Sequence, residues 1–235
     1  MLKFRTLLGF GLCVPVLLGA VWSGCSSSEG GSGDTALVDV YRLTQQFDLS
    51  IPMSSTKFNE TRRIPRTSSC ERDDISPPIA WGDVPDGTVS LAVLVDSNQL
   101  LREEIPDLLW VHWVLWNIPS DAVGLPEAVP KESGVPSIGP RTGQGTNDDK
   151  NIGWSGPCKP ALGIGWTQYD PLKNKQKKGG AGLISKYYFR LYALDIEVDL
   201  PGEATKIDFL RAIDGHILAG GELVGEFVAQ NVMTK

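Results

Sequence analysis

WVHWVLWNIP, residues 110–119, is the stretch that decides the fold, because it carries apolar side chains at alternate and adjacent positions of an extended chain. Its tryptophans and aliphatic residues surround His112, one of only two histidines in the protein; the other is His216. SLAVLVD, residues 90–96, is a second such run. Runs that are apolar on both faces predict central strands of a sheet that is covered on each side.

The rest of the chain predicts a mainly β protein with few helices. Further strands are expected at Leu43–Ile51, at 186–195 and at 221–228. One helix is expected at 204–219, where Thr205 can cap the first turn and apolar residues recur at helical spacing. The 26 glycines and 16 prolines punctuate the remainder and favour a loop-rich sandwich.

The composition narrows the class of protein. Hydrophobic residues make up 41% of the chain, which is enough for a globular core. The formal net charge is −6 and the pI is about 5.0. An acidic chain of this kind argues against nucleic acid as the main partner, because phosphate backbones attract a basic surface.

The first 24 residues have the layout of a secretory signal. Lys3 and Arg5 precede an apolar run from Leu7 to Trp22, and small residues lead up to Cys25. The run is short for a stable transmembrane helix. Ser23-Gly24-Cys25 resembles the bacterial lipobox, which implies that Cys25 is lipidated and becomes the new N-terminus.

Trp22 departs from the lipobox pattern, which usually has leucine at that position, so plain secretion and a retained anchor stay open as alternatives. Residues 25–42 are expected to form the lipidated cysteine and a flexible Ser/Gly-rich tether, and residues 43–235 the folded domain. Ser26 after the cysteine resembles the sorting signal for the outer membrane. These features predict a lipid-anchored protein of the bacterial cell envelope, on the outer membrane and facing the periplasm or the surface.

Two cysteines remain after the signal and the lipidated residue, Cys70 and Cys158. In an exported and oxidising compartment one pair of this kind can form a disulfide; two buried thiols are the alternative. Their spacing fits no zinc pattern, and we predict no metal site and no cofactor.

Asp96 and His112 are expected at the same end of the sheet, if strands 90–96 and 110–118 are antiparallel neighbours joined by residues 97–109. Strict alternation places Asp96 on the face of Ala92 and Leu94. It places His112 on the face of Trp110, Val114 and Trp116. A carboxylate beside the imidazole would fix its tautomer and could form a small polar pocket. A structurally satisfied core histidine is the alternative.

Six separate motifs then carry a family resemblance. They are DISPPIAW (74–81), SLAVLVD (90–96), WVHWVLWNIP (110–119), SGPC (155–158), YYFRLYALD (187–195) and GHILAGGELVGEF (215–227). In this order they resemble the phosphatidylethanolamine-binding protein family, in its bacterial Raf kinase inhibitor-like branch, over residues 43 to about 230. The resemblance implies an antiparallel β-sandwich with a few short helices. It also implies a pocket for a small anion, either phosphate or a phospholipid head group.

The resemblance carries over to the pocket residues only in part. The ligand-binding residues it implies are Asp96, Asn98, His112, Gly156, Pro157, Ser185 and Tyr187. The family has a second acid where this chain has Asn98, and a second histidine where it has Ser185. We therefore expect a pocket that persists with altered chemistry, because one strong donor for phosphate is replaced by a weaker one.

Two other function classes stay open beside a ligand-binding or regulatory module. One is a protein-interaction or inhibitor module in which the pocket is vestigial. The other is a weak hydrolase with Ser155, His112 and Asp96 as its triad, although Pro157 breaks the usual nucleophile motif. No catalytic residue is predicted.

Residues 161–185 look inserted relative to the family. The stretch is rich in glycine and contains Lys173, Lys175, Lys177 and Lys178. A solvated surface loop is the plain interpretation. The alternative is that the lysines meet an acidic lipid surface or a protein partner.

Overall fold

A computed structural model of the protein describes residues 48–58, 62–97, 109–158 and 184–228, together with two strands at 167–170 and 175–178. The chain divides into two units, residues 1–31 and 32–235, and every described residue belongs to the second. The predicted signal, Cys25 and the tether therefore lie outside the described residues, as does Asn98. Among the described residues, no helix combines the length and apolar character needed to cross a membrane.

The large sheet has five antiparallel strands in the order β10-β9-β3-β4-β6. Its strands are β3 (Ser90–Ser97), β4 (Trp110–Pro119), β6 (Gly143–Gln144), β9 (Ile184–Leu194) and β10 (Ile217–Val228). A smaller sheet has the order β1-β2-β5, from β1 (Met53–Ser54), β2 (Ile79–Trp81) and β5 (Gly124–Leu125). A 3-10 turn, η1, covers Arg66–Ser68, and the α-helix α2 covers Lys206–Ile213.

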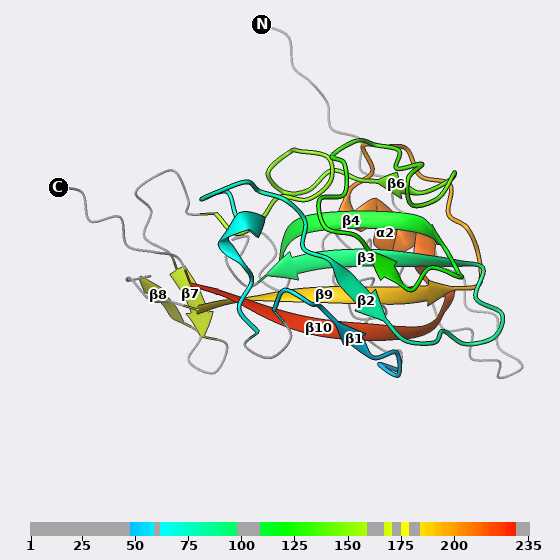
Figure 1. Ribbon diagram of the computed structural model, residues 1–235, viewed down its shortest axis with the longest axis horizontal. Coiled ribbons are helices and arrows are strands. Elements are labelled where there is room, and N and C mark those ends of the chain that lie inside the picture. The colour runs from blue at the N-terminus through cyan, green and yellow to red at the C-terminus, as the bar shows by residue number, and fades with distance from the viewer. Residues whose placement is uncertain are drawn as a thin grey trace, which may run out of the picture. The chain divides into compact units, whose positions relative to one another are not determined.

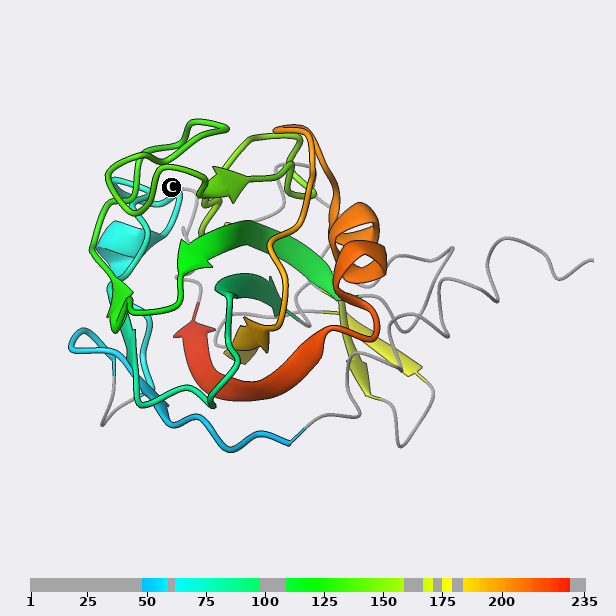
Figure 2. The same ribbon diagram turned by 90° about the vertical axis from the view of Figure 1, so that its right-hand side faces the viewer.

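Each face of the large sheet has its own apolar core. On one face, β3, β4 and β9 pack against residues of the smaller sheet, including Ile79, Trp81 and Leu125. On the other face they pack against α2 through Phe209, Leu210 and Ile213. Figure 1 shows β1 and β2 in front of the large sheet and α2 behind it, and Figure 2 shows how strongly the large sheet curves. The prediction of a mainly β sandwich is confirmed.

The strand at 90–96 is central, as its sequence predicted. Every residue of β3 is buried, because β4 and β9 flank it and an apolar layer covers each face. The pairing of β3 with β4 is interrupted at the functional end. Val95 pairs with Trp113, but Asp96 pairs with Val111, so His112 is the extra residue of a β-bulge.

Two predicted elements have different bounds in the structure, the helix near residue 205 and the first strand. The helix expected at 204–219 ends at Ile213, because Gly215 has a positive φ of 77° and Ile217 begins β10. The described part of the strand expected at Leu43–Ile51 is not a strand; β1 begins at Met53. The capping of α2 by Thr205 is as predicted, in a reciprocal pair with Asp208.

The inserted segment contains paired strands. β7 (Thr167–Asp170) and β8 (Lys175–Lys178) form a two-stranded antiparallel sheet of their own. Lys175, Lys177 and Lys178 lie in β8, whereas Lys173 lies outside the described residues. The segment is therefore more than the plain loop we expected, and β9 begins within its predicted end, at Ile184.

Candidate functional site

His112 lies at the centre of the candidate site. The bulge turns its ring toward the core shared with the smaller sheet, where the ring centroid lies 4.8 Å from that of Tyr187. The side chain is buried, at 2% exposure. Its Nδ1 lies 2.6 Å from the carbonyl oxygen of Ser155, and its Nε2 lies 2.9 Å from the Ser97 hydroxyl. Burial lowers the pKa of His112 from 6.5 to about 4, so the ring is neutral at pH 7.

Ser97 and Tyr187 form the wall of the site opposite the histidine. They are directly paired across β3 and β9, and both are fully buried. The Ser97 hydroxyl hydrogen-bonds the Tyr187 side chain as well as the ring of His112. Burial raises the pKa of the Tyr187 hydroxyl well above its usual 10, so this group keeps its proton.

The loop that carries Gly156 and Pro157 holds the other side of the ring. Ser155 N donates to the backbone oxygen of His112 at 3.0 Å, and Gly156 N donates to Asp74 Oδ1 at 2.7 Å. A Cβ on Gly156 would lie only 1.9 Å from the Ser68 carbonyl oxygen, so the close approach of these two segments requires glycine.

A disulfide ties this loop to the segment around η1. Cys70 and Cys158 are bonded, with their Cα atoms 5.3 Å apart. Cys70 N also donates to the Pro157 carbonyl oxygen at 3.2 Å. Trp154 directly precedes Ser155, and its Nε1 donates to the Ser68 carbonyl oxygen at 3.1 Å. The backbone oxygen that fixes the ring is therefore itself held by a covalent cross-link and several hydrogen bonds.

Asp149 adds an acid at the edge of the site. Its carboxyl group hydrogen-bonds the side chains of Ser155 and Trp110 and interacts electrostatically with Tyr187. Burial raises the pKa of Asp149 above its usual 3.8. The sequence did not identify Asp149 as a site residue, because its place beside Ser155 and Trp110 depends on how the loop folds back.

Asp96 lies on the opposite face from His112, which corrects the predicted pair. Its carboxylate contacts Arg190 Nη1 and Lys206 Nζ, each at 2.6 Å, beneath α2. Burial alone would raise its pKa, but the two cations and their hydrogen bonds lower the pKa of Asp96 below 3.8. Arg190 also binds Glu222 at 3.1 Å, so the cluster contains two cations and two carboxylates. The prediction failed because the bulge at His112 breaks the strict alternation of faces.

The hydrolase triad considered from the sequence is not assembled. The ring of His112 contacts the backbone oxygen of Ser155, while the Ser155 hydroxyl is within 3.5 Å of Asn151 Nδ2. Asp96 is on the other side of the sheet. Ser97, which the sequence analysis passed over, is the hydroxyl that meets the ring. Its position directly after Asp96, with the side chain on the other face, was the signal that could have identified it.

Of the remaining predicted residues, Gly156 and Pro157 directly follow Ser155, whose carbonyl oxygen contacts the ring. Gly156, Pro157 and Ser185 are buried, and Ser185 lies on β9 two residues before Tyr187. Within the described ranges there is no group of three or more His, Cys, Asp or Glu residues that could hold a metal ion.

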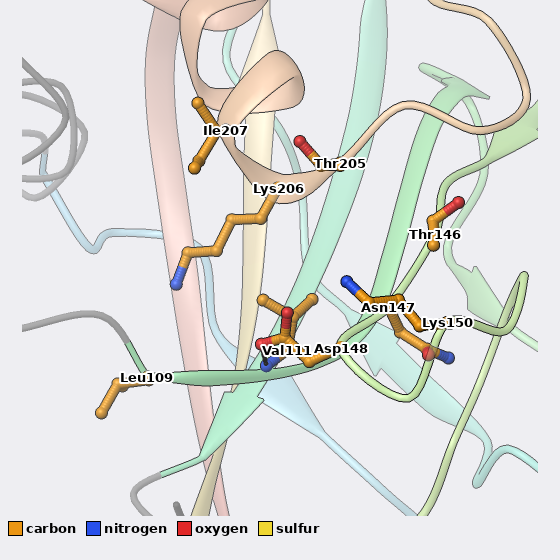
Figure 3. Close-up of a pocket in the computed structure, with 9 residues that line it drawn as sticks. All are labelled: Leu109, Val111, Thr146, Asn147, Asp148, Lys150, Thr205, Lys206 and Ile207. Carbon is orange, nitrogen blue, oxygen red and sulfur yellow. Dashed lines mark hydrogen bonds between the residues drawn. The ribbon is translucent and has the colours of Figure 1, made fainter. Parts of the chain in front are cut away.

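A small cavity of about 110 Å³ lies on the α2 side of the same sheet end. Figure 3 shows its lining from the first turn of α2, the start of β4 and the loop between β6 and β7. It is lined by Leu109, Val111, Thr146, Asn147, Asp148, Lys150, Thr205, Lys206 and Ile207. Asp148 Oδ2 accepts a hydrogen bond from Val111 N at 2.8 Å, which ties this loop to β4.

Comparison with known proteins agrees with this arrangement. The sequence profile of the phosphatidylethanolamine-binding protein family matches residues 54–163. A UPF0098 protein of Methanothermobacter thermautotrophicus is 36% identical over 168 residues, which cover 72% of this chain and 92% of that protein. The chain belongs to the phosphatidylethanolamine-binding protein family. The resemblance of its motifs to this family is confirmed.

Solved structures of similar proteins support the same fold. The crystal structure of a phosphatidylethanolamine-binding protein homologue from Chlamydia trachomatis is 29% identical, with a TM-score of 0.59 over 78% of this chain and 100% of that one. YbcL of Escherichia coli, described as a member of the mammalian family, has a TM-score of 0.61 and 20% identity over 77% of this chain and 99% of its own. YbcL shows similarity of fold alone.

Proposed function

We propose that this member of the phosphatidylethanolamine-binding protein family is a ligand-binding or regulatory module whose site at His112 takes a small anion, either phosphate or a phospholipid head group. The observation that supports this most is the buried ring itself. Both of its nitrogens are engaged, at 2.6 and 2.9 Å, and two hydroxyl-bearing residues, Ser97 and Tyr187, contact it.

The way the site is held also supports binding over a purely structural role. Gly156 is the residue that the close approach to Ser68 requires, and the Cys70–Cys158 disulfide fixes the loop beside it. Burial of an ionisable ring costs stability, because the folded protein must keep it neutral. A core without function would be served as well by an apolar side chain at this position.

Titration calorimetry with the full chain in detergent tests the proposal. Phosphate and phosphoethanolamine are the ligands, with His112→Ala as the variant and His216→Ala as the matched control, because these are the two histidines of the chain. We expect saturable binding that His112→Ala abolishes and His216→Ala preserves. Absence of binding by the unaltered protein would favour the alternative, an interaction or inhibitor module that contacts a protein partner.

We also propose that the protein is exported and anchored by a lipid on Cys25, with the domain held off the outer membrane by residues 25–42. The signal-like first 24 residues and Ser26 support this, and so does a disulfide in the domain, since such bonds persist in oxidising compartments. Changing Cys25 to Ala should release the protein from the membrane fraction. Continued membrane association of that variant would contradict lipid anchoring.

A further inference from the structure

The ring of His112 is enclosed by the residues that the structure describes, so solvent or a ligand reaches it only when one side of the enclosure moves. The ring is buried, and so are Ser97 and Tyr187 beside it. β3 and β9, which carry those two residues, are paired along the whole length of β3. Residues 154–158, on another side of the ring, form no helix or strand. Because a loop opens at lower cost than paired central strands, this loop is the side that can move.

Residues 154–158 are joined to the segment 66–74 by one covalent bond and by hydrogen bonds. The covalent bond is the Cys70–Cys158 disulfide, which links positions 88 residues apart in the sequence. Three hydrogen bonds join the same segments: Gly156 N to Asp74 Oδ1, Cys70 N to the Pro157 oxygen, and Trp154 Nε1 to the Ser68 oxygen. A hydrogen bond exchanges readily with water, whereas the disulfide persists until it is reduced. The disulfide therefore limits how far this loop can leave the ring.

The disulfide lies where a reductant can reach it and where the fold depends on it least. Cys70 is exposed and Cys158 is partly exposed. Neither cysteine is among the described residues of the two apolar cores. A domain of the size of residues 43–235 buries enough apolar surface to fold without disulfides, unlike small secreted domains. Exposed disulfides are also the ones that dithiols reduce most readily.

We propose that the redox state of the Cys70–Cys158 disulfide controls access to His112. In the oxidised protein, the disulfide holds the loop against the segment 66–74 and the ring is enclosed. Reduction by a protein dithiol releases residues 154–158 and opens the ring to solvent and to a ligand. The inference goes beyond the proposed function, because it concerns access to the ring and its test requires no ligand.

The reduction proceeds through a mixed disulfide and requires a dithiol of the thioredoxin type. A thiolate of the reductant attacks the sulfur of Cys70, the more exposed cysteine, and Cys158 leaves as a thiolate. The second thiolate of the reductant then attacks the reductant sulfur of the mixed disulfide and displaces Cys70. Two electrons pass to the protein, the reductant becomes a disulfide, and the two cysteine thiolates take up the two protons that the reductant has lost.

Amide hydrogen exchange tests the inference on the full chain in detergent, followed by NMR at pH 7 with and without dithiothreitol. The Ser155 and Gly156 amides report on the loop, because they donate to the His112 oxygen and to Asp74. A disulfide typically changes an opening equilibrium by a factor of about 30 to 1000, so reduction should speed exchange of both amides by about 30-fold or more. The Val135 amide, which donates to the Thr142 oxygen, is the reference outside the loop.

Urea separates local opening of the loop from unfolding of the whole domain. Local opening exposes little surface, so the exchange rates of Ser155 and Gly156 in the reduced protein should be the same without urea and in about 1 M urea. Rates that climb steeply with urea, or an equal increase at Val135, would show that reduction only weakens the fold, and would overturn the inference. Failure of both dithiothreitol and reduced thioredoxin to reduce the folded protein, judged by maleimide labelling of Cys70 and Cys158, would overturn it too.

Nitrogen-15 NMR of the ring supplies a second readout. Burial lowers the pKa of His112 to about 4, and this effect is larger than that of the Ser155 hydrogen bond, which raises the pKa. Exposure to water should therefore raise the pKa of His112 toward 6.5 in the reduced protein. The carboxylates of Asp74 and Asp96 also raise it, and Asp96 lies beneath α2, away from the loop. An unchanged pKa on reduction would mean that the ring stays enclosed, against the inference.

A variant without the disulfide makes the test independent of added reductant. Changing both Cys70 and Cys158 to Ser should give the fast loop exchange of the reduced protein, and dithiothreitol should leave that exchange unchanged. Slow exchange in this variant, as in the oxidised protein, would show that the hydrogen bonds alone close the loop and that the disulfide controls nothing.

Asp74→Gly tests whether the disulfide and the hydrogen bonds hold the same loop. It removes the carboxylate that accepts from Gly156, and glycine adopts the φ of 51° at this position without strain. In the reduced protein it should speed loop exchange by about 10-fold or more, whereas in the oxidised protein the disulfide should suppress the effect. Thr142→Val is the matched control, because it removes a buried hydrogen bond to the Asn117 oxygen outside the loop, and it should change loop exchange in neither state. An equal effect of Asp74→Gly in both redox states would overturn the inference.

Discussion

The two faces of one sheet end hold their ionisable groups in opposite ways. In three pairs of consecutive residues, the first side chain lies on the α2 side and the second on the His112 side. These pairs are Asp96 and Ser97, Val111 and His112, and Asp148 and Asp149. On the α2 side, buried charges form ion pairs. On the other side, the buried ring is neutral and meets uncharged oxygens.

The difference shows that, at equal depth of burial, the available partners decide whether a buried group keeps its charge. Asp96 and His112 are equally inaccessible, at 0% and 2% exposure. Asp96 meets two cations and stays ionised, whereas His112 meets a carbonyl and a hydroxyl and gives up its proton. The face with fixed charges supports the fold, and the face with the neutral ring carries the proposed ligand site.

Removing the charge of Asp96 should have the largest effect on stability. Asp96→Asn removes the carboxylate that Arg190 and Lys206 share and leaves Arg190 with Glu222 alone, and loss of one partner of a buried pair costs about 3–5 kcal/mol. Urea unfolding at pH 7 measures it. Asp195→Asn is the control, since Asp195 forms an exposed pair with His216, where a change of at most about 1 kcal/mol is expected.

A loss below about 1 kcal/mol in Asp96→Asn would contradict the comparison. Such a result would mean that the Asp96 carboxylate does not stabilise the buried cations on the α2 side. The contrast between the charged α2 side and the neutral His112 side would then be lost.

Lowering the pH should have the next largest effect on stability, through protonation of His112. The ring has a pKa of about 4 when folded and about 6.5 when unfolded, so the unfolded chain binds more protons between these values. The contribution is complete above pH 6.5 and is lost as the pH falls to 4. A difference of this size corresponds to about 3 kcal/mol in the free energy of unfolding.

Urea unfolding from pH 7 to pH 4 measures this loss, and His112→Gln should remove it while His216→Gln leaves it in place. Only the difference between proteins is diagnostic, because the raised pKa of Asp149 contributes with the opposite sign. Equal slopes for the unaltered protein and His112→Gln would show that the ring is not held neutral by the fold.

The comparison also shows what the sequence could predict. The apolar runs identified β3, β4 and β9, because strands covered on both faces need apolar residues at consecutive positions. The two faces at the functional end could not be assigned in the same way. One extra residue at His112 reverses the alternation, and nothing in WVHWVLWNIP marks it.

The sequence predicted some residues of the candidate site and missed others. The family motifs named His112, Gly156, Pro157 and Tyr187, which the structure brings together. Ser97 was overlooked because the resemblance to the family implied no ligand role for it. Lys206, the helix-borne partner of Asp96, lies 110 positions away in the chain, and a contact of that separation depends on the packing of α2.

Weakening the first turn of α2 should have the smallest effect and should separate the two faces most cleanly. Thr205 and Asp208 cap each other's backbone N–H groups, and Lys206, which reaches Asp96, follows directly. Thr205→Ala should cost about 1 kcal/mol of unfolding free energy, the usual loss for a helix cap. Because the cap touches only the α2 side, the pKa of His112 followed by NMR should stay at about 4. A rise in that pKa would mean that the ion pairs on one face control the proton on the other, and the two faces would then be one coupled site.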